Sequence, residues 1–328
     1  MTTPAGSPAP LGEFGRIAKF FAPLATTPGA LGLTDDAALL DCPPGERLVV
    51  TVDAMVEDVH FLPDDPPDLV ARKLMRVNLS DLAAMAARPV GYLLTTALPK
   101  SRGDDWLERF AQGLAQDQAE FGVTLLGGDS VSTPGPLTLT LTAFGRVSAG
   151  AEVRRGGAGP GDLVFVSGTI GDGALGLEAA RGKLDGLLDP AAVAYLADRY
   201  RLPQPRVGLG PRLAGLASAM MDVSDGLVGD LGHICEVSRA AGVIEAAHVP
   251  LSAAATRLDR LETALTGGDD YELLFTAPPD RRDAILAVAA AAGVPVTVIG
   301  RIEAGQGVRV LDAKGAELNF AGQGWRHF

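Results

Sequence analysis

The sequence is poor in cysteine, in histidine and in aromatic residues. Cys42 and Cys235 are its only cysteines and neither belongs to a CxxC pair, so a disulfide framework and a thiolate zinc site are both excluded. No apolar run approaches the roughly 20 residues of a membrane-spanning helix. The first residues, MTTPAGSPAPLGEFGRI, have neither the basic start nor the apolar stretch of a signal peptide. These features predict a protein of the reducing cytoplasm.

Basic residues are also scarce. The chain has 28 Lys and Arg against 40 Asp and Glu, a net charge of -12. Nucleic acids and anionic membranes are bound through basic surfaces, so neither is expected as a partner. The P-loop pattern GxxxxGK[ST] is absent as well. An acidic chain can still bind a phosphate ester when divalent cations lie between the negative groups.

What the sequence does contain is an alternation of strand and helix patterns. The 328 residues are enough for two domains, and the aperiodic, glycine-rich segment 148–162 is the expected place for a boundary. We therefore predict an α/β fold (α+β type) of two mixed domains, residues 1–149 and 150–328. Strands are expected at 47–53, 90–99, 137–147, 163–168, 271–277, 294–302 and 307–312, with a short strand and a turn at 123–129. Helices are expected at 69–87, 104–122, 172–182, 191–200, 210–219, 227–242 and 281–292.

Carboxylates recur where the predicted apolar segments end. The segment MDVSDGLVGDL (221–231) is the densest case, with Asp222, Asp225 and Asp230. Taken singly such acids are N-caps or turn residues, and Asp81 and Asp225 each follow a serine and precede an apolar helical stretch, as an N-cap would. Their repetition instead favours Mg²⁺, which carboxylates, phosphates and water bind. Both interpretations stay open at this point. Asp230, about one turn further along, is expected to be a solvated neighbour.

Two glycine-rich segments are of interest for phosphate binding. Gly171-x-Gly173-x-x-Gly176 matches the dinucleotide fingerprint by letter, but no strand ending in an acid follows at the expected distance. A tight strand-to-helix turn is the preferred interpretation. The segment LLGGDS (125–130) is better suited to phosphate, because glycines expose backbone N–H groups and Asp129 can hold a metal.

Cationic and aromatic candidates are few. Arg154 and Arg155 either belong to a solvated linker or clamp a nucleotide phosphate, and the sequence does not decide between the two. His60, in EDVHF, is the histidine that we expect to touch a substrate. Trp325 lies near the end of the sequence, where an exposed tryptophan is unfavourable unless it packs on a neighbour or a ligand.

Seven segments occur in an order that resembles the thiamine-monophosphate kinase family. They are LTDDAALL, VTVDAMVEDVHF, RVNLSDLAAMAARP, LLGGDS, RGGAGPGDLVFVSGTIGDGALGL, MDVSDGLVGDLGHI and TGGDDYELLF. The resemblance covers nearly the whole chain, and VTVDAMVEDVHF is its most discriminating part. The chain departs from the family pattern at Thr34, Ala86 and Asp269, where the family usually has Gly, Gly and Glu. The SDGL and GGDD segments also occur in aminoimidazole ribonucleotide synthetase and selenophosphate synthetase.

The resemblance implies ATP-dependent phosphorylation of thiamine monophosphate to thiamine diphosphate, with several Mg²⁺ ions and a homodimer formed through the N-terminal sheets. The implied metal residues are Asp35, Thr51, Val52 through its backbone oxygen, Asp53, Asp81, Asp129, Asp222 and Asp225. The implied ATP contacts are Phe110, Gly128, Asp129, Arg155 and Ser224. The implied substrate contacts are His60, Asp269, Glu272 and Trp325. No residue stands out as a nucleophile or general base, which predicts direct in-line transfer between the two phosphates.

Two other functions remain to be weighed. One is another ATP-using enzyme of the same superfamily. A selenophosphate synthetase would normally carry a reactive cysteine near a glycine-rich N-terminus, whereas Cys42 lies in the turn LDCPPGE, and a hydrogenase-maturation relative would end in a functional cysteine where this sequence has RHF. The other is a non-catalytic nucleotide-binding protein of this fold, which loss of the acids would indicate. The acids are present.

Overall fold

The computed structural model describes residues 12–320. The chain divides into two compact units, of which unit 1 holds the residues up to 41 with 52–75 and 90–143, and unit 2 holds 42–51, 76–89 and the residues from 144 onward. Both cysteines are free thiols, as predicted, Cys42 exposed and Cys235 buried. Within residues 12–320 no helix is long and apolar enough to cross a membrane. A domain boundary between residues 149 and 150 stays a prediction.

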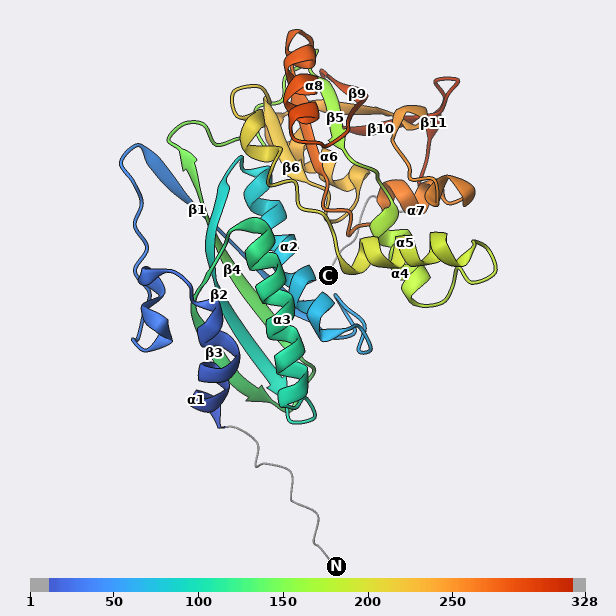
Figure 1. The fold of residues 1–328 in the computed structure, drawn as a ribbon. Coiled ribbons are helices and arrows are strands. Elements are labelled where there is room, and N and C mark those ends of the chain that lie inside the picture. Colours follow the sequence, from blue (N-terminus) through green and yellow to red (C-terminus); the bar gives the residue numbers. More distant parts are fainter. Residues whose placement is uncertain (1–11, 321–328) are drawn as a thin grey trace, which may run out of the picture. The chain divides into compact units, whose positions relative to one another are not determined.

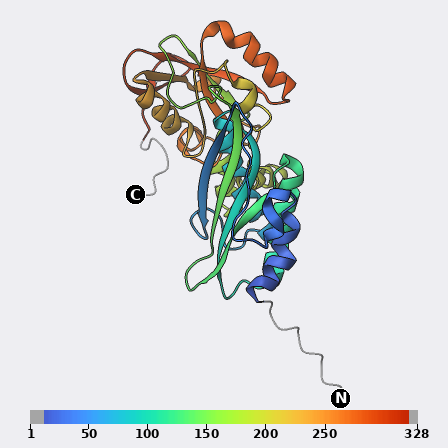
Figure 2. The same ribbon diagram turned by 90° about the vertical axis from the view of Figure 1, so that its left-hand side faces the viewer.

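A four-stranded sheet has the strand order β1-β4-β2-β3 (Figure 1). Its strands are β1 (Glu46–Val56), β2 (Arg88–Pro99), β3 (Leu125–Thr133) and β4 (Thr138–Ser148), and β2 pairs with β3 in parallel. In β4 the leucines of LTLTLT are buried and the threonines are half-buried, so the predicted two-residue alternation is confirmed. Helices α2 (Pro67–Ala84) and α3 (Asp104–Phe121) lie along one side of the strands (Figure 2).

Short helices precede the first strand, and the sequence patterns did not predict them. They are α1 (Glu13–Arg16), the π-helix η1 (Ile17–Phe21) and the 3₁₀ helices η2 (Ala22–Leu24) and η3 (Pro28–Leu33). Arg16 forms an ion pair with Asp104 at the start of α3, with Nε and Oδ1 2.8 Å apart. The backbone N–H of Thr26 donates to Oγ1 of Thr124. These two contacts hold the segment against the same unit.

The second sheet is seven-stranded, in the order β11-β10-β7-β9-β5-β8-β6. Its strands are β5 (Leu163–Ser167), β6 (Ala219–Asp222), β7 (Ala241–Glu245), β8 (Leu273–Ala277), β9 (Val296–Glu303), β10 (Gly307–Leu311) and β11 (Glu317–Leu318). The β10–β7 pair is parallel and the other pairs are antiparallel. The helices of the same part of the chain are α4 (Asp172–Ala180), α5 (Pro190–Arg201), α6 (Leu227–Ser238), α7 (Leu261–Thr266) and α8 (Arg282–Ala291), with the 3₁₀ helices η4 (Gly210–Leu213), η5 (Ala246–His248), η6 (Ala255–Arg257) and η7 (Pro279–Arg281).

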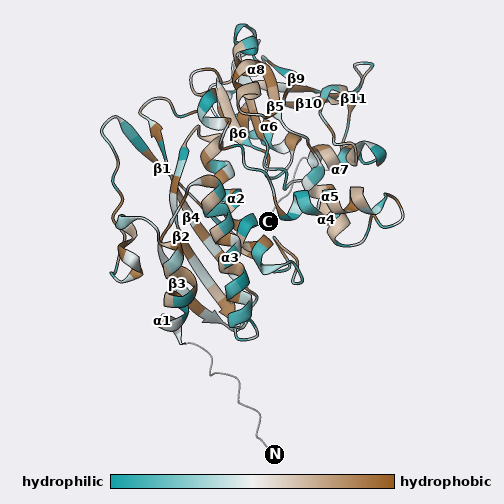
Figure 3. Ribbon diagram, in the orientation of Figure 1, coloured by the Kyte–Doolittle hydropathy of each residue, from teal (hydrophilic) through white to brown (hydrophobic). Residues whose placement is uncertain are grey.

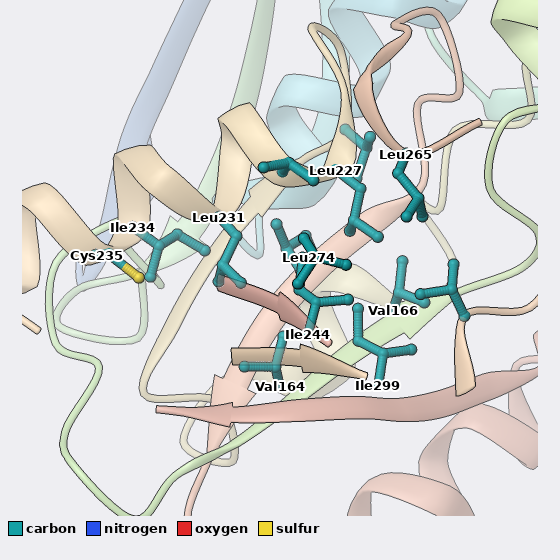
Figure 4. Packing of buried hydrophobic residues seen from close by; sticks show 14 of the residues in the cluster. Val164, Val166, Leu227, Leu231, Ile234, Cys235, Ile244, Leu265, Leu274 and Ile299 are labelled. Carbon is teal, nitrogen blue, oxygen red and sulfur yellow. The ribbon is translucent and has the colours of Figure 1, made fainter. Parts of the chain in front are cut away.

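Helix α6 supplies much of one core beside this sheet (Figure 4). Leu227, Leu231 and Ile234 are fully buried and belong to the same cluster as Val164 of β5 and Leu274 of β8. Figure 3 shows the strands of this sheet mostly in brown, as expected for strands whose side chains are buried. The N-terminus of α6 directly follows the acidic segment 222–225, so the packing of this helix fixes where that segment lies.

Two predicted helices differ from the structure. The helix expected at 227–242 ends at Ser238, because Arg239 takes a left-handed conformation (φ 57). Gly242 then lies in β7, where an added Cβ would meet the Leu231 side chain at 2.8 Å, so glycine allows the strand to pack closely against α6. The helix expected at 210–219 is only the 3₁₀ helix η4, and the strand β6 follows it.

Candidate active site

Three segments that are distant in the sequence meet in unit 2, at the end of β6. Asp222 is the last residue of β6 and is 3% exposed. Ser80 of α2 donates a hydrogen bond from Oγ to Asp222 Oδ2 at 2.6 Å, across 142 residues of sequence. Its neighbour Asp81 accepts from Thr51 of β1, with Oγ1 and Oδ2 2.5 Å apart. The structure thus brings together three of the predicted metal residues, Thr51, Asp81 and Asp222.

Asp81 lies inside α2 and not at its start. The N-cap interpretation is therefore wrong for Asp81, and it is also wrong for Asp225, because the N-cap of α6 is Gly226. Burial raises the pKa of this carboxyl above its usual range, while the hydrogen bond from Thr51 and the positive charge of Arg155 act to lower it. Burial disfavours the ionised form of a carboxylate, and a nearby cation would stabilise that form.

Arg155 is positioned by a loop that is attached to β6. The backbone N–H of Met220 donates to the Arg154 carbonyl at 2.9 Å, and the N–H groups of Gly157 and Ala158 donate to Ser238 Oγ of α6. The interpretation as a free solvated linker is therefore wrong for the backbone. The two arginines differ, because Arg154 pairs with Glu152 at 2.8 Å whereas Arg155 acts on Asp81.

Asp230 shapes the acidic loop that follows β6. Its Oδ2 accepts from the backbone N–H groups of Ser224, Asp225 and Gly226 at 3.1, 3.2 and 3.0 Å. The side chain is fully buried, so the expectation that Asp230 is a solvated neighbour is wrong. Burial, and then the nearby charge of Asp225, raise the pKa of Asp230 to about 7, although the three N–H groups act to lower it. The side chain of Asp230, which lies inside α6, therefore holds the acidic loop that precedes this helix.

Of the other predicted metal residues, Asp225 belongs to the acidic loop of unit 2, and the rest belong to unit 1. In β1, Asp53 is half-buried and shares a strand face with Thr51, while Val52 points to the opposite face with 57% of its surface exposed. Asp35 and Asp129 are exposed acids of the same unit. Asp129 Oδ1 accepts from the N–H of Ser130 at 2.8 Å.

Two predicted ATP contacts in unit 1 also have structural reasons to be there. A Cβ on Gly128 would lie 1.8 Å from the Leu94 carbonyl oxygen, so the β2–β3 pair requires glycine at this position. Phe110 is fully buried in α3 and its ring stacks on Trp106 with centroids 5.0 Å apart. Its role in nucleotide binding stays a prediction.

His60 lies after β1 with one ring nitrogen already engaged. Its Nδ1 accepts from the backbone N–H of Val56 at 3.0 Å, so the neutral imidazole carries its proton on Nε2. Its carbonyl accepts from the buried Lys73 ammonium at 3.1 Å. The ring orientation is therefore set by a hydrogen bond to the backbone.

The GGDDYE segment joins the acidic loop through backbone hydrogen bonds. The N–H groups of Asp269 and Tyr271 donate to the carbonyls of Ser224 and Val223 at 2.9 and 2.8 Å, and Val223 N–H donates to the Glu272 carbonyl at 2.8 Å. These bonds continue the antiparallel β6–β8 pairing beyond the sheet. Asp269 and Tyr271 both have positive φ, 71 and 52, which costs free energy for residues other than glycine.

The carboxyl group of Asp270 joins this strained segment to the start of α4. Its carboxyl accepts from the N–H groups of Gly171 and Gly173 at 2.7 and 2.9 Å, at the start of α4. A Cβ on Gly173 would lie 2.2 Å from the Asp269 carbonyl oxygen. The prediction that these glycines make a tight strand-to-helix turn is confirmed, since Gly171 is the N-cap of α4 with φ 88.

Glu272 is placed in the interior of unit 2. It is fully buried and accepts from Ser167 Oγ at 2.6 Å, from Arg199 at 3.1 Å and from both Nε and Nη2 of Arg206. Asp269, by contrast, is half-buried. Trp325, the remaining predicted substrate contact, lies outside the described residues.

Several of these anchoring residues escaped the sequence analysis. Ser80 precedes the predicted metal residue Asp81, but nothing in its spacing indicates Asp222 as its partner. Arg199 and Arg206 follow no motif, and Asp270 was grouped with the neighbouring acids of GGDDYE. These residues have one sequence feature in common, which is a polar side chain within an otherwise apolar, buried segment.

Comparison with known families places this arrangement in a defined class. Residues 34–147 match the family model of the AIR synthase related protein N-terminal domain, and residues 159–313 match that of the C-terminal domain. The two matches together span most of the chain, so the fold and site define an AIR synthase related protein.

Individual relatives narrow this class. The chain is 44% identical to the thiamine-monophosphate kinase of Caulobacter vibrioides over 97% of this chain and 92% of the relative, and 40% identical to that of Escherichia coli K12 over 97% and 98%. A thiamine-monophosphate kinase structure from Stenotrophomonas maltophilia shares 43% identity with a TM-score of 0.79, covering 84% of this chain and 89% of that one. The chain belongs to the thiamine-monophosphate kinase family.

Two further structures bear on ligands and on fold. A structure described as AaThiL complexed with AMPPCP and TMP is 31% identical, with a TM-score of 0.77 and 97% coverage of both chains. A hydrogenase maturation protein HypE in complex with ATP has a TM-score of 0.75 over 97% of both chains, but its identity is 21%. The likeness to HypE therefore concerns the fold alone.

Proposed function

We propose that this chain transfers the γ-phosphoryl group of ATP to thiamine monophosphate, forming thiamine diphosphate. The observation that carries the proposal is the Ser80–Asp222 hydrogen bond of 2.6 Å, which unites the Asp81 segment with the Asp222–Asp225 loop. The relative bound to AMPPCP and TMP supports it. AMPPCP is ATP with a methylene group in place of the β,γ-bridging oxygen, and we take TMP to be the thiamine ester.

Several Mg²⁺ ions belong to this proposal. The donors suit Mg²⁺ because they are carboxylate, hydroxyl and carbonyl oxygens. A cation would also offset the desolvation of the half-buried Asp81 and the buried Asp222. When bound, the ions offset the repulsion between the two phosphates and align the reacting oxygens. The proposed ligands are Asp35, Thr51, the Val52 carbonyl, Asp53, Asp81, Asp129, Asp222 and Asp225.

The chain's own groups then bind and orient the two substrates. Arg155 and Ser224 are proposed to hold ATP phosphates, with Gly128 and Asp129 from β3. His60 offers Nε2–H to thiamine monophosphate. Asp269 is the acid that we assign to this substrate, because Asp269 is half-buried whereas Glu272 is fully buried and held by two arginines. A phosphate monoester is mostly a dianion near pH 7, since its second pKa is about 6. The acceptor therefore needs no strong base, and we expect one inversion at phosphorus.

Removing single ligand charges tests the metal set. We expect Asp53→Asn and Asp81→Asn each to reduce turnover by more than about a hundredfold, since loss of even an outer-shell partner costs about 10–100-fold. The fold should persist in Asp81→Asn, because the amide oxygen of the new side chain can still accept from Thr51. Thiamine diphosphate formation at limiting Mg²⁺ is the assay, and Asp105→Asn, an exposed acid of α3, is the control. Near-normal turnover in either variant would remove that residue from the set.

Stereochemistry tests the route of the phosphoryl group. With chirally labelled γ-phosphate, direct transfer gives inversion, whereas a covalent enzyme intermediate gives net retention. Trapping of γ-label on the protein without thiamine monophosphate would also contradict direct transfer.

Trp325→Ala should raise KM for thiamine monophosphate more than KM for ATP, because aromatic stacking is worth about 0.5–1.5 kcal/mol. Equal changes would make Trp325 a structural residue.

We also propose that the four-stranded sheet forms a homodimer. The edge strand β1 exposes Leu48, Val50 and Val52 by 39, 53 and 57%, an apolar row that a second copy would cover. Val50→Lys should lower the sedimentation coefficient to that of a monomer, while Leu187→Lys, at a residue 59% exposed outside the sheet, should not. A wild-type monomer at micromolar concentration would contradict the proposal.

A cytoplasmic location for the protein stays a prediction.

A further inference from the structure

The start of α6 holds three potential ligands. One ligand atom each from Asp225, Asp230 and His233 lies within 4.8 Å of the other two. Asp230 and His233 are three residues apart on the same helix, so they share a face. Asp225 immediately precedes the glycine that caps this helix.

Asp230 supplies a second and independent observation. Its Oδ2 is used by three backbone N–H groups, as described above, but its Oδ1 is buried and has no hydrogen-bond partner. A buried carboxylate oxygen without a partner costs free energy. The repulsion from Asp225 increases that cost. A cation at Oδ1 would satisfy the oxygen and neutralise both acids.

The access and the donor types indicate which cation fits. His233 is exposed and Asp225 is half-buried, while Asp230 is fully buried. The three-residue cluster is therefore accessible to solvent at the His233 imidazole and buried at Asp230. Imidazole suits transition-metal ions, whereas Mg²⁺ prefers oxygen ligands only.

We propose that Asp225, Asp230 and His233 form a divalent-cation site with one imidazole nitrogen among its ligands, suited to Mn²⁺, Co²⁺ or Zn²⁺. It differs in kind from the oxygen-only set proposed for the ATP phosphates. The two sets share Asp225, so the test is made without nucleotide and without an activity measurement.

Pulsed EPR of Mn²⁺ added to the nucleotide-free full-length protein reads nitrogen ligation directly. We expect coupling to a histidine nitrogen in the wild type and its loss in His233→Gln. The matched control is His248→Gln, because His248 is also exposed and forms an ion pair with Glu245 at 2.8 Å. This control should keep the coupling. No nitrogen coupling in the wild type, or coupling that survives in His233→Gln, overturns the proposal.

Asp230→Asn tests the closed end of the site. An amide oxygen can still accept the three N–H bonds, but the NH₂ group in place of Oδ1 cannot bind a cation. The nitrogen-coupled Mn²⁺ should bind at least about tenfold more weakly, since outer-shell changes alone cost that much. Unchanged affinity would remove Asp230 from the site. Either failure leaves the kinase proposal intact, because that proposal is read from thiamine diphosphate formation.

Discussion

The stability of the acidic loop should fall as the pH rises, because of Asp230. The pKa of this carboxyl is raised from 3.8 to about 7 in the folded protein. A raised pKa means that the folded state holds a proton that the unfolded state has lost, so the contribution is complete below about pH 4 and disappears as the pH passes 7. At about 1.4 kcal/mol per unit the whole shift amounts to about 4 kcal/mol, of which about 2–3 kcal/mol falls between about pH 5 and pH 8.

Amide hydrogen exchange measures this effect where it acts. The N–H groups of Ser224, Asp225 and Gly226 are bonded to Asp230, and their protection, corrected for intrinsic exchange, reports local stability. A chelator is included, because a bound cation would favour the ionised carboxylate. We expect protection to fall by a factor of about 30–150 from about pH 5 to pH 8 in the wild type.

Two variants isolate Asp230 from the other titrating groups. Asp230→Asn keeps an acceptor for the N–H groups but does not titrate, so its protection should change little over the same range. Asp225→Asn removes the charge that is the second cause of the raised pKa, and it should give an intermediate fall. Equal pH profiles in the wild type and in Asp230→Asn would refute the reasoning, and so would protection that rises with pH.

Three further predictions concern the anchoring residues of unit 2. Asp270→Asn turns one acceptor for the N-terminus of α4 into a donor, so the melting temperature should fall by about 4 °C or more for a loss of about 2 kcal/mol; calorimetry would check this. Arg206→Lys cannot keep the two-pronged contact with Glu272, which holds the segment that carries Asp269, so it should raise KM for thiamine monophosphate more than KM for ATP in steady-state kinetics. Ser80→Ala removes the 2.6 Å hydrogen bond from the Ser80 hydroxyl to the buried Asp222 carboxylate and should cost about 1–3 kcal/mol, measured as a shift in the urea midpoint.

Much of the fold was predictable where one periodicity dominates. The alternation in LTLTLT identified β4, and the amphipathic pattern with Gly122 at its end identified α3, whose cap has φ 67. The end of α6 was missed because the apolar pattern continues into β7, while the backbone of Arg239 turns left-handed to stop the helix. Such a turn depends on packing between the helix and its sheet, which one sequence does not show.

The site was predictable in its residue types and not in its geometry. A Ser-Asp pair before an apolar run is compatible both with an N-cap and with an acid inside a helix. Asp81 is an acid inside a helix. The letters GGDDYE contain three acids with different environments, from the half-buried Asp269 to the fully buried Glu272. Which carboxylate faces a ligand and which supports the fold depends on partners such as Arg206 that lie far away in the sequence.

The backbone bonds between the acidic loop and GGDDYE have a thermodynamic consequence. Ser224 and Asp269 share the 2.9 Å hydrogen bond that joins these two segments, so a ligand that shifts one segment must also shift the other. Nucleotide held at Ser224 and thiamine monophosphate held at Asp269 would then be linked ligands. Whatever factor the first applies to the affinity of the second, the second must apply to the first. Order of addition can change how quickly the ternary complex forms, but not this reciprocal free energy.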